Sequence, residues 1–399
     1  MFEYTRQPLK ALYLVCVVLS VVARLPLWTV KALLPATRPR KSWPVYRTIL
    51  VWSIDAFVAS WFKTGFPHEP LEEDDPGFVW IEPIHEEWIL GEIKDLAETN
   101  GVEPVRVHGY WRGNGLGDDR SALTRHAEPQ EKILYYLHGG GYVMGTANGK
   151  TTLASSPYSL SVPAHAPKIF KRSFALGYRL SAAAPLEPKN PFPASLFDAL
   201  AGYRYLVEDA GFQPKDIIVC GDSAGGHLAL VLTRYLIAYP IPKLDVPGGL
   251  MLMSPTSDWG RTYDNGNPKS SAVVHRNTDY VYEIVKNGYA GRSIAGSLPP
   301  EVLDTNSWFS PSSLHLKETD GLFKGFPPTL INCGGAEMAR DEKRTLRDRM
   351  IRDCGQDTVT YLEYEDAVHD FILVTFFEPE RTRGLDDIRN WLQKITATK

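Results

Sequence analysis

The sequence predicts an α/β fold, with a mostly parallel central sheet covered by helices on both faces. Short apolar runs rich in β-branched and aromatic residues recur along the chain, and each has the pattern of a buried strand. Helical patterns separate these runs, and strands that alternate with helices form parallel sheets with both faces covered. The clearest runs lie at residues 133–137, 217–220, 249–253 and 329–333.

Length and composition exclude several classes of protein. A chain of 399 residues that is 44% hydrophobic can bury a large core, and α/β domains often take 200–250 residues. The net charge of −4, without a basic stripe, gives no indication of a nucleic-acid partner. The four cysteines are scattered and form no Cys-x-x-Cys pair, so we expect no metal site, no disulfide framework and no cofactor. The oligomeric state stays open.

The N-terminal region carries an apolar run at residues 11–23, which only Ser20 interrupts. The run is too short to span a bilayer unless it continues to residue 35, so possible membrane association is assigned to residues 11–35. An anchor or interfacial helix, a cleaved signal peptide and a cap helix remain open. Basic residues after the run favour a membrane-associated protein with a cytosol-facing α/β domain, as at the endoplasmic reticulum. Secretion or a soluble cytoplasmic state are the alternatives.

The other elements follow in order. We expect a helix at residues 49–66, a linker at 67–76 and a loop at 114–119. Residues 261–326 break the alternation and are rich in Gly, Pro, Asn and aromatics, so they form a predicted cap insertion. The expected domains are residues 1–70, a cap or membrane-associated region, and 71–399, the α/β domain. Further strands are predicted at 77–84, 102–111, 173–178 and 358–364, and further helices at 151–160, 193–209 and 383–396.

A candidate nucleophile lies where the strand at residues 217–220 ends. The strand enters Gly-Asp-Ser-Ala-Gly-Gly, residues 221–226, and a helical pattern follows. A serine between glycines on a strained strand–turn–helix stands exposed at the carboxyl end of the sheet. The helix N-terminus also favours negative charge that develops there. An ordinary glycine turn with a serine N-cap has the same local sequence, so the rest of the chain must decide.

Partners for Ser223 follow in the order serine, acid, histidine. Glu337 and Asp341 come after the strand at 329–333, and His369 comes after the last strand. The chain also contains His-Gly-Gly-Gly at 138–141, Tyr-Arg-Leu at 178–180 with Pro-Phe-Pro-Ala at 191–194, and a final His-Asp-Phe at 369–371. Over about residues 100–395 it resembles the hormone-sensitive-lipase branch of the α/β-hydrolases, which includes arylacetamide-deacetylase-like proteins and microbial carboxylesterases.

The resemblance implies an α/β-hydrolase fold and a serine hydrolase that cleaves a small hydrophobic carboxylic ester. Ser223 would be the nucleophile, His369 the base and Glu337 the triad acid. The oxyanion would be bound by backbone N–H groups, those of Gly140, Gly141 and Ala224. Two departures stand out. The family has Asp where this chain has Glu337, which leaves Asp341 as an alternative acid, and the chain inserts several residues at 181–190.

Neighbouring residues receive supporting roles, and other functions stay open. We expect His138 to anchor its loop, Asp222 to brace the serine turn, and Asp341 to cap its helix or pair with Arg340 or Lys343 at the surface. Asp366 and Asp370 are the next candidates to hold the imidazole. The same residues could support non-hydrolytic acyl transfer, or cyclisation or elimination on a biosynthetic intermediate. A binding protein is disfavoured because His369 is present.

Overall fold

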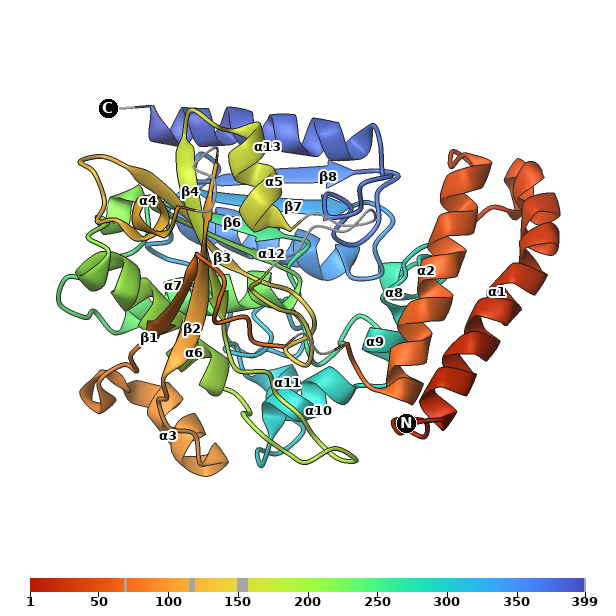
Figure 1. The fold of residues 1–399 in the computed structure, drawn as a ribbon, viewed down its shortest axis with the longest axis horizontal. Helices are drawn as coiled ribbons and strands as arrows, with labels where there is room; N and C mark the ends of the chain where they lie inside the picture. Colours follow the sequence, from red (N-terminus) through yellow and green to blue (C-terminus); the bar gives the residue numbers. More distant parts are fainter. Residues whose placement is uncertain (68–69, 115–118, 149–156, 398–399) are drawn as a thin grey trace.

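An eight-stranded sheet forms the centre of the computed structural model, which describes residues 1–67, 70–114, 119–148 and 157–397 (Figure 1). The strand order is β1-β2-β4-β3-β5-β6-β7-β8. β2 is antiparallel to both β1 and β4, and every other neighbouring pair is parallel. The prediction of a mostly parallel sheet is therefore confirmed.

The strands coincide with the apolar runs of the sequence. The predicted strand at 102–111 begins later, at Val107, since Pro104 has no N–H to donate to a ladder. The bounds are β1 Phe78–Ile81, β2 Val107–Gly113, β3 Lys132–Leu137, β4 Phe170–Gly177, β5 Ile217–Asp222, β6 Gly249–Met253, β7 Thr329–Gly334 and β8 Val359–Tyr364.

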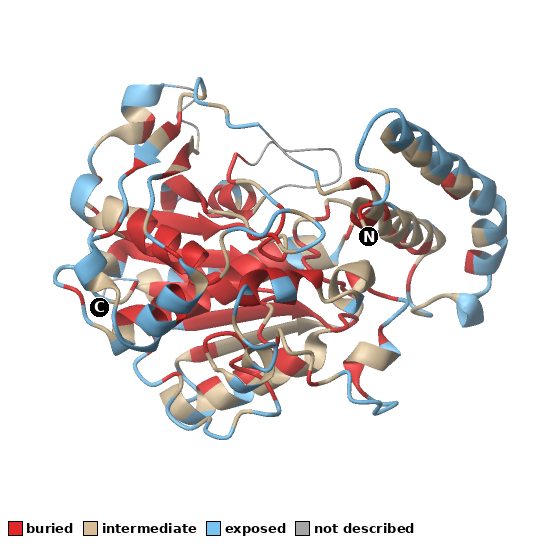
Figure 2. Ribbon diagram, turned by 90° about the horizontal axis from the view of Figure 1, so that it is seen from below, coloured by how far each residue is buried: buried red, intermediate tan, exposed pale blue. Residues whose placement is uncertain are grey.

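Helices cover the sheet on both faces, and the buried residues form a band between these layers (Figure 2). α5 (Tyr158–His165) and α13 (Glu380–Thr396) pack on one face. On the other face lie α3 (Gly91–Asn100), α6 (Ala194–Arg204), α7 (Ala224–Ala238) and α12 (Arg340–Cys354). The short α4 (Arg120–Thr124) precedes β3. Much of the helix predicted at 151–160, and most of the loop predicted at 114–119, lie outside the described residues.

The segment between β6 and β7, where the sequence predicts a cap insertion, consists of loops and short helices. It contains α8 (Ser271–Val274), α9 (Tyr282–Lys286), α10 (Tyr289–Ala295) and α11 (Val302–Thr305). All four helices are short, in keeping with the Gly, Pro and Asn content of this segment.

The N-terminal region forms a helical hairpin of α1 (Leu9–Leu33) and α2 (Val45–Thr64) beside the sheet (Figure 1). α1 extends well beyond the predicted apolar run and passes through Pro26. By length and composition it is the one helix of the described part that could cross a membrane, a test that signal sequences also pass. α2 packs on α9, so the hairpin contacts the segment between β6 and β7.

Candidate active site

Ser223 lies between β5 and α7 in a strained turn. Its backbone has φ 50° and ψ −117°, and its N–H donates to the Met253 carbonyl at 2.8 Å. A Cβ on Gly221 would collide with the backbone of Gly225, and a Cβ on Gly225 would collide with the Leu137 carbonyl. Only glycine fits at both positions, which is why the strand can turn so sharply into the helix. The predicted strand–turn–helix around the serine is therefore present.

A glycine loop follows β3 and faces the same cavity as Ser223. Gly140 and Gly141 have φ values of +108° and +64°, and a Cβ on Gly140 would collide with the Met144 carbonyl. These conformations require glycine and free the backbone N–H groups of side-chain cover. His138 stacks on Tyr178 with ring centroids 4.2 Å apart, and burial lowers the pKa of His138 to about 4. His138 is thus a neutral anchor of this loop, as predicted.

Glu337 is the predicted acid that the fold brings to the imidazole. Its Oε2 lies 3.2 Å from His369 Nδ1, and both side chains are buried. The other carboxylate oxygen, Oε1, accepts hydrogen bonds from the Ser254 hydroxyl at 2.7 Å and from the Gly334 N–H at 2.5 Å. The extra methylene of glutamate is accommodated by this cradle at the end of β7.

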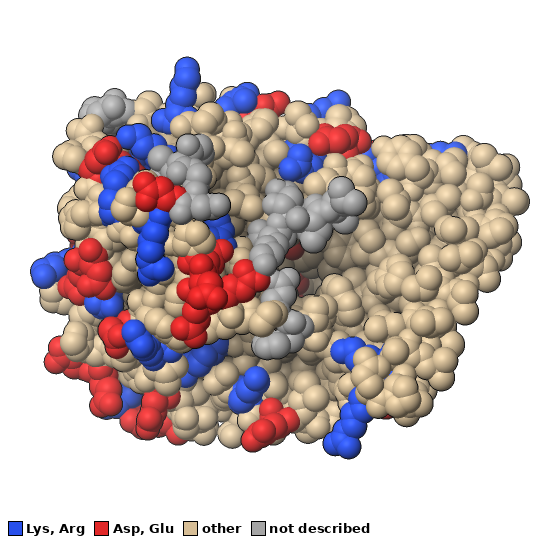
Figure 3. Space-filling model, in the orientation of Figure 1, with Lys and Arg blue, Asp and Glu red and all other residues tan. Residues whose placement is uncertain are grey.

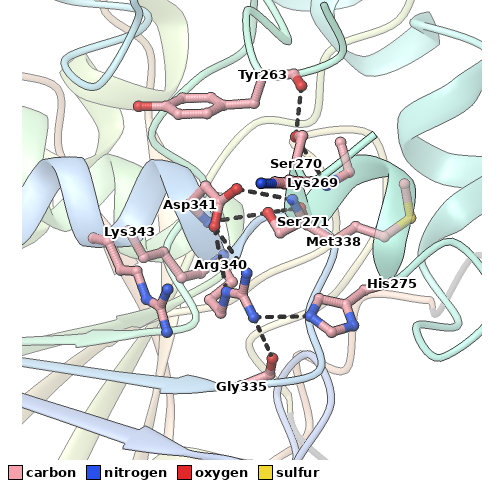
Figure 4. A network of polar contacts seen from close by, with 12 residues as sticks. Tyr263, Lys269, Ser270, Ser271, His275, Gly335, Met338, Arg340, Asp341 and Lys343 are labelled. Atoms are coloured by element: carbon pink, nitrogen blue, oxygen red, sulfur yellow. Dashed lines mark hydrogen bonds and ion pairs between the residues drawn. The ribbon is translucent and has the colours of Figure 1, made fainter. Parts of the chain in front are cut away.

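Asp341 has a different role, which Figure 4 shows. Its Oδ2 accepts the Ser271 N–H at 2.8 Å, and its Oδ1 lies 3.1 Å from the Arg340 guanidinium. Asp341 therefore ties α8 to the first turn of α12. The predicted pairing with Arg340 is confirmed.

The expectation that Lys343 lies at the surface is wrong. Lys343 is completely buried, and its Nζ lies 2.9 Å from Glu337 Oε2. Burial alone would raise the pKa of Glu337, but the Lys343 ammonium and the His369 contact outweigh burial and lower it to about 2. A lysine in a helix with charges of alternating sign is typical of an exposed position, so no sequence pattern indicates this ion pair.

A second carboxylate faces the imidazole from its other side. Asp370 Oδ2 lies 3.2 Å from His369 Nε2. Burial disfavours the imidazolium, but Asp370 and Glu337 outweigh burial and raise the pKa of His369. In the described part of the chain no hydrogen bond joins Ser223 to His369, although both side chains line one cavity. Sequence reasoning treats Asp370 only as an alternative partner and misses this contact with Nε2.

Asp222 has the bracing role that the sequence predicts. Its Oδ1 accepts a hydrogen bond from the Tyr136 hydroxyl at 2.6 Å, which links the serine turn to β3. Burial and the charge of Asp370 raise the pKa of Asp222 to about 8. Asp222 and Asp370 are both buried, and both line the cavity.

The cavity has a volume of about 660 Å³ and is bounded by the hairpin, the insertion and the carboxyl ends of the strands. Trp61 comes from α2 of the hairpin, Pro67 follows α2, and Ile284 and Val285 come from α9. A cavity of this size and lining suits a small, largely apolar ligand. In the ranges that the structure describes, no three His, Cys, Asp or Glu residues are grouped so as to hold a metal ion.

Known proteins share this architecture. A family model described as the alpha/beta hydrolase fold matches residues 134–373. An esterase of Acinetobacter venetianus is 26% identical over 299 residues, which cover 74% of this chain and 83% of the relative. An acetyl-hydrolase of Streptomyces hygroscopicus is 28% identical over 282 residues, 71% and 82% of the two chains. The crystal structure of an esterase from the bacterial hormone-sensitive lipase family superposes with a TM-score of 0.57 at 22% identity, over 87% of this chain and 98% of the other. The chain therefore belongs to the α/β-hydrolase fold family.

Proposed function

We propose that this carboxylic ester hydrolase works through an acyl-enzyme on Ser223. The observation that carries the proposal is the strained turn that presents Ser223 to the cavity also lined by His369, whose Nδ1 is held by Glu337. His369 Nε2 takes the hydroxyl proton as Ser223 attacks the ester carbonyl, and returns that proton to the departing alcohol. Water then attacks the acyl-enzyme by the same route and releases the acid and free Ser223.

The side chains around the imidazole determine how the proton moves during these reaction steps. Glu337 fixes the tautomer that leaves Nε2 free to accept, and its charge stabilises the imidazolium. Nε2 faces Asp370 in the resting arrangement, so the imidazole must turn from Asp370 toward Ser223 when the ester binds. Small adjustments of this kind are common, because catalytic hydrogen bonds often tighten only in the substrate complex.

The developing oxyanion is assigned to the backbone N–H groups of Gly140, Gly141 and Ala224. The two glycines lie at the cavity with positive φ, and Ala224 begins α7 directly after the nucleophile. One such donor contributes roughly 3–4 kcal/mol of transition-state stabilisation in comparable sites. The apolar walls formed by Trp61, Ile284 and Val285 favour a hydrophobic ester.

Replacing Ser223 by alanine tests the proposed reaction. We expect turnover of short p-nitrophenyl esters to fall to the background rate while the melting temperature stays near that of the wild type. A fluorophosphonate probe should label wild-type Ser223, identified by peptide mass, and should not label the variant. Turnover by Ser223→Ala near the wild-type rate would remove Ser223 from the mechanism. Ser53, a half-buried serine of α2 that donates to the Ile49 carbonyl, supplies the matched Ser53→Ala control.

We also propose that α1 holds the protein at a membrane. More than half of the large apolar side chains that the structure describes as exposed fall between Leu9 and Leu34. Leu12, Leu19 and Val30 are each 60% or more exposed. The hairpin presents a largely uncharged surface in Figure 3, and most residues of α1 are exposed in Figure 2. An apolar face of this length in contact with water marks an interaction surface.

The face of α1 that points away from α2 is apolar, whereas three of its polar side chains lie on the side toward α2. Ser20, Arg24 and Lys31 of α1 line a groove between α1 and α2, together with Asp55, so these three polar side chains lie on the α2 side of α1, where Arg24 and Lys31 stay exposed to solvent. α2 is in turn tied to the start of α13, because the Arg47 guanidinium binds the Glu380 carboxylate at 2.8 Å. We therefore expect α1 to lie in the bilayer interface with its apolar face in the lipid.

Sedimentation with vesicles tests the membrane proposal. Full-length protein should pellet with phosphatidylcholine–phosphatidylserine vesicles, and Leu12→Glu/Leu19→Glu/Val30→Glu should stay in the supernatant. The control carries the same three charges at exposed apolar positions elsewhere, Val105, Val274 and Leu314. Wild-type protein that never pellets would overturn the proposal. So would a mature protein that begins at Arg24, since cleavage there would remove most of the apolar face.

A further inference from the structure

A buried lysine contacts the same carboxylate oxygen as the imidazole. Glu337 Oε2 is 3.2 Å from His369 Nδ1 and 2.9 Å from Lys343 Nζ, and neither Glu337 nor Lys343 is exposed to solvent. Lys343 also donates to the Ala339 carbonyl at 3.2 Å, which fixes its ammonium at the start of α12. A buried charge without a partner is very unfavourable, so this ion pair is not an incidental contact.

The position of Lys343 follows from the fold of the segment after β7. Glu337 lies in the turn that leaves β7, and α12 begins at Arg340. Lys343 lies on the buried side of α12 with Leu346 and Met350, so its stem packs in the core while its ammonium reaches back to Glu337. The lysine is thus held by the helix that directly follows the turn carrying Glu337.

We propose that Lys343 is a positioning residue that keeps Glu337 ionised and sets the proton affinity of the Glu337–His369 pair. The inference rests on the proposed roles of Glu337 and His369 in ester hydrolysis. Lys343 touches neither the imidazole nor the cavity, so it acts only through Glu337. The positive charge of Lys343 partly cancels the effect of the negative charge of Glu337, which stabilises the protonated imidazole.

The direction of the effect follows from charge alone. A proton taken up by the Glu337–His369 pair lies near the Lys343 ammonium, whether it is bound to the imidazole nitrogen or to the carboxylate oxygen. The two positive charges repel each other, which weakens proton binding. Removing the Lys343 charge therefore strengthens proton binding by the pair. The other groups around the imidazole, which are Asp370, Asp279, Asp222 and Tyr280, stay in place, as do Glu342 and Cys333 around the lysine.

The pH profile of Lys343→Met tests the inference, because methionine keeps the volume and removes the charge. The acid limb of kcat/KM on a soluble p-nitrophenyl ester should move to higher pH by about one unit or more. Arg344→Met is the matched control. Arg344 is the next residue of α12, and its guanidinium pairs with the Glu363 carboxylate at 2.9 Å, away from Glu337. Arg344→Met removes one positive charge, as Lys343→Met does. Its acid limb should stay within experimental error of the wild type.

A stability cycle covers the case in which Lys343→Met folds poorly. Each single change, Lys343→Met or Glu337→Gln, removes one member of the buried ion pair and leaves the other without it, whereas the double variant removes both. The double variant should therefore melt at a higher temperature than either single variant. Equal losses of melting temperature from Lys343→Met in both backgrounds, or an unmoved acid limb, would reduce Lys343 to a packing residue. Failure of the proposed function itself would appear separately, as normal turnover by Ser223→Ala.

Discussion

At the scale of single residues, two neighbouring carboxylates in one sequence segment have separate tasks. Glu337 leaves β7 in the first turn and reaches His369 Nδ1, whereas Asp341 lies four residues later and binds the Ser271 N–H. The carboxyl end of a parallel strand is where site residues gather, and a helix start is where a carboxylate can bind free N–H groups. Position relative to the strand end, and not residue type, separates the two roles.

Isosteric amides at the two positions should therefore behave differently. Glu337→Gln should lower kcat by about 10³- to 10⁴-fold, because an amide can neither stabilise the imidazolium nor enforce its tautomer. It also leaves Lys343 without its partner. Asp341→Asn should lower kcat less than tenfold, since it loosens α8 without touching the imidazole. Steady-state kinetics on one ester, with circular dichroism as the folding control, make the comparison. The reverse ranking would identify Asp341 as the acid.

At the scale of elements, continuous apolar runs were the most informative part of the sequence. β3, β5, β6 and β7 are buried on both faces, so their bounds could be predicted to within two residues. The strand β2, which lies between β1 and β4, was placed less well, because the predicted run began before Pro104, which has no N–H to donate to a ladder. α3 was missed altogether, since only Ile93, Leu96 and Ala97 of its ten residues are buried.

Long-range electrostatic partners account for what the sequence could not predict. The candidate serine, acid and histidine could be named because each follows a strand end in a fixed order. Lys343 and the contact of Asp370 with Nε2 depend on how α12 and the last loop pack, which no local pattern records. The same applies to α1, whose Arg24 and Lys31 seemed to end the apolar run but face α2.

At the scale of the whole molecule, the hairpin is attached to both loops that carry the candidate site. At one end, Phe2 and Phe62 pack in a cluster with Val143 and Met144, just after the glycine loop. At the other end, the Trp43 indole donates to the Asp366 carbonyl at 2.8 Å, three residues before His369. The surface proposed to contact lipid is therefore part of the same body as the proposed oxyanion loop and base.

The polar contacts at the second attachment allow a test of this connection. Arg40 and Ser42 donate to the Asp366 carboxylate at 3.1 and 2.6 Å, and Arg40 also donates to the Glu365 carbonyl at 2.8 Å. Arg40→Met/Ser42→Ala should free the segment before His369 and lower kcat on a soluble ester by about tenfold, within the ~10²-fold that a 1 Å misplacement can remove.

The control for that test is Lys63→Met, which breaks an exposed ion pair with Glu3 at the opposite end of the hairpin, 2.9 Å long. Exposed pairs contribute about 0–1 kcal/mol, so this variant should keep wild-type kcat and melting temperature. If both variants keep wild-type kcat, the hairpin only covers the site. The Arg40/Ser42 variant keeps α1 and its apolar face, so its vesicle binding should be unchanged. If this variant alone loses turnover, the attachment positions His369 independently of the membrane.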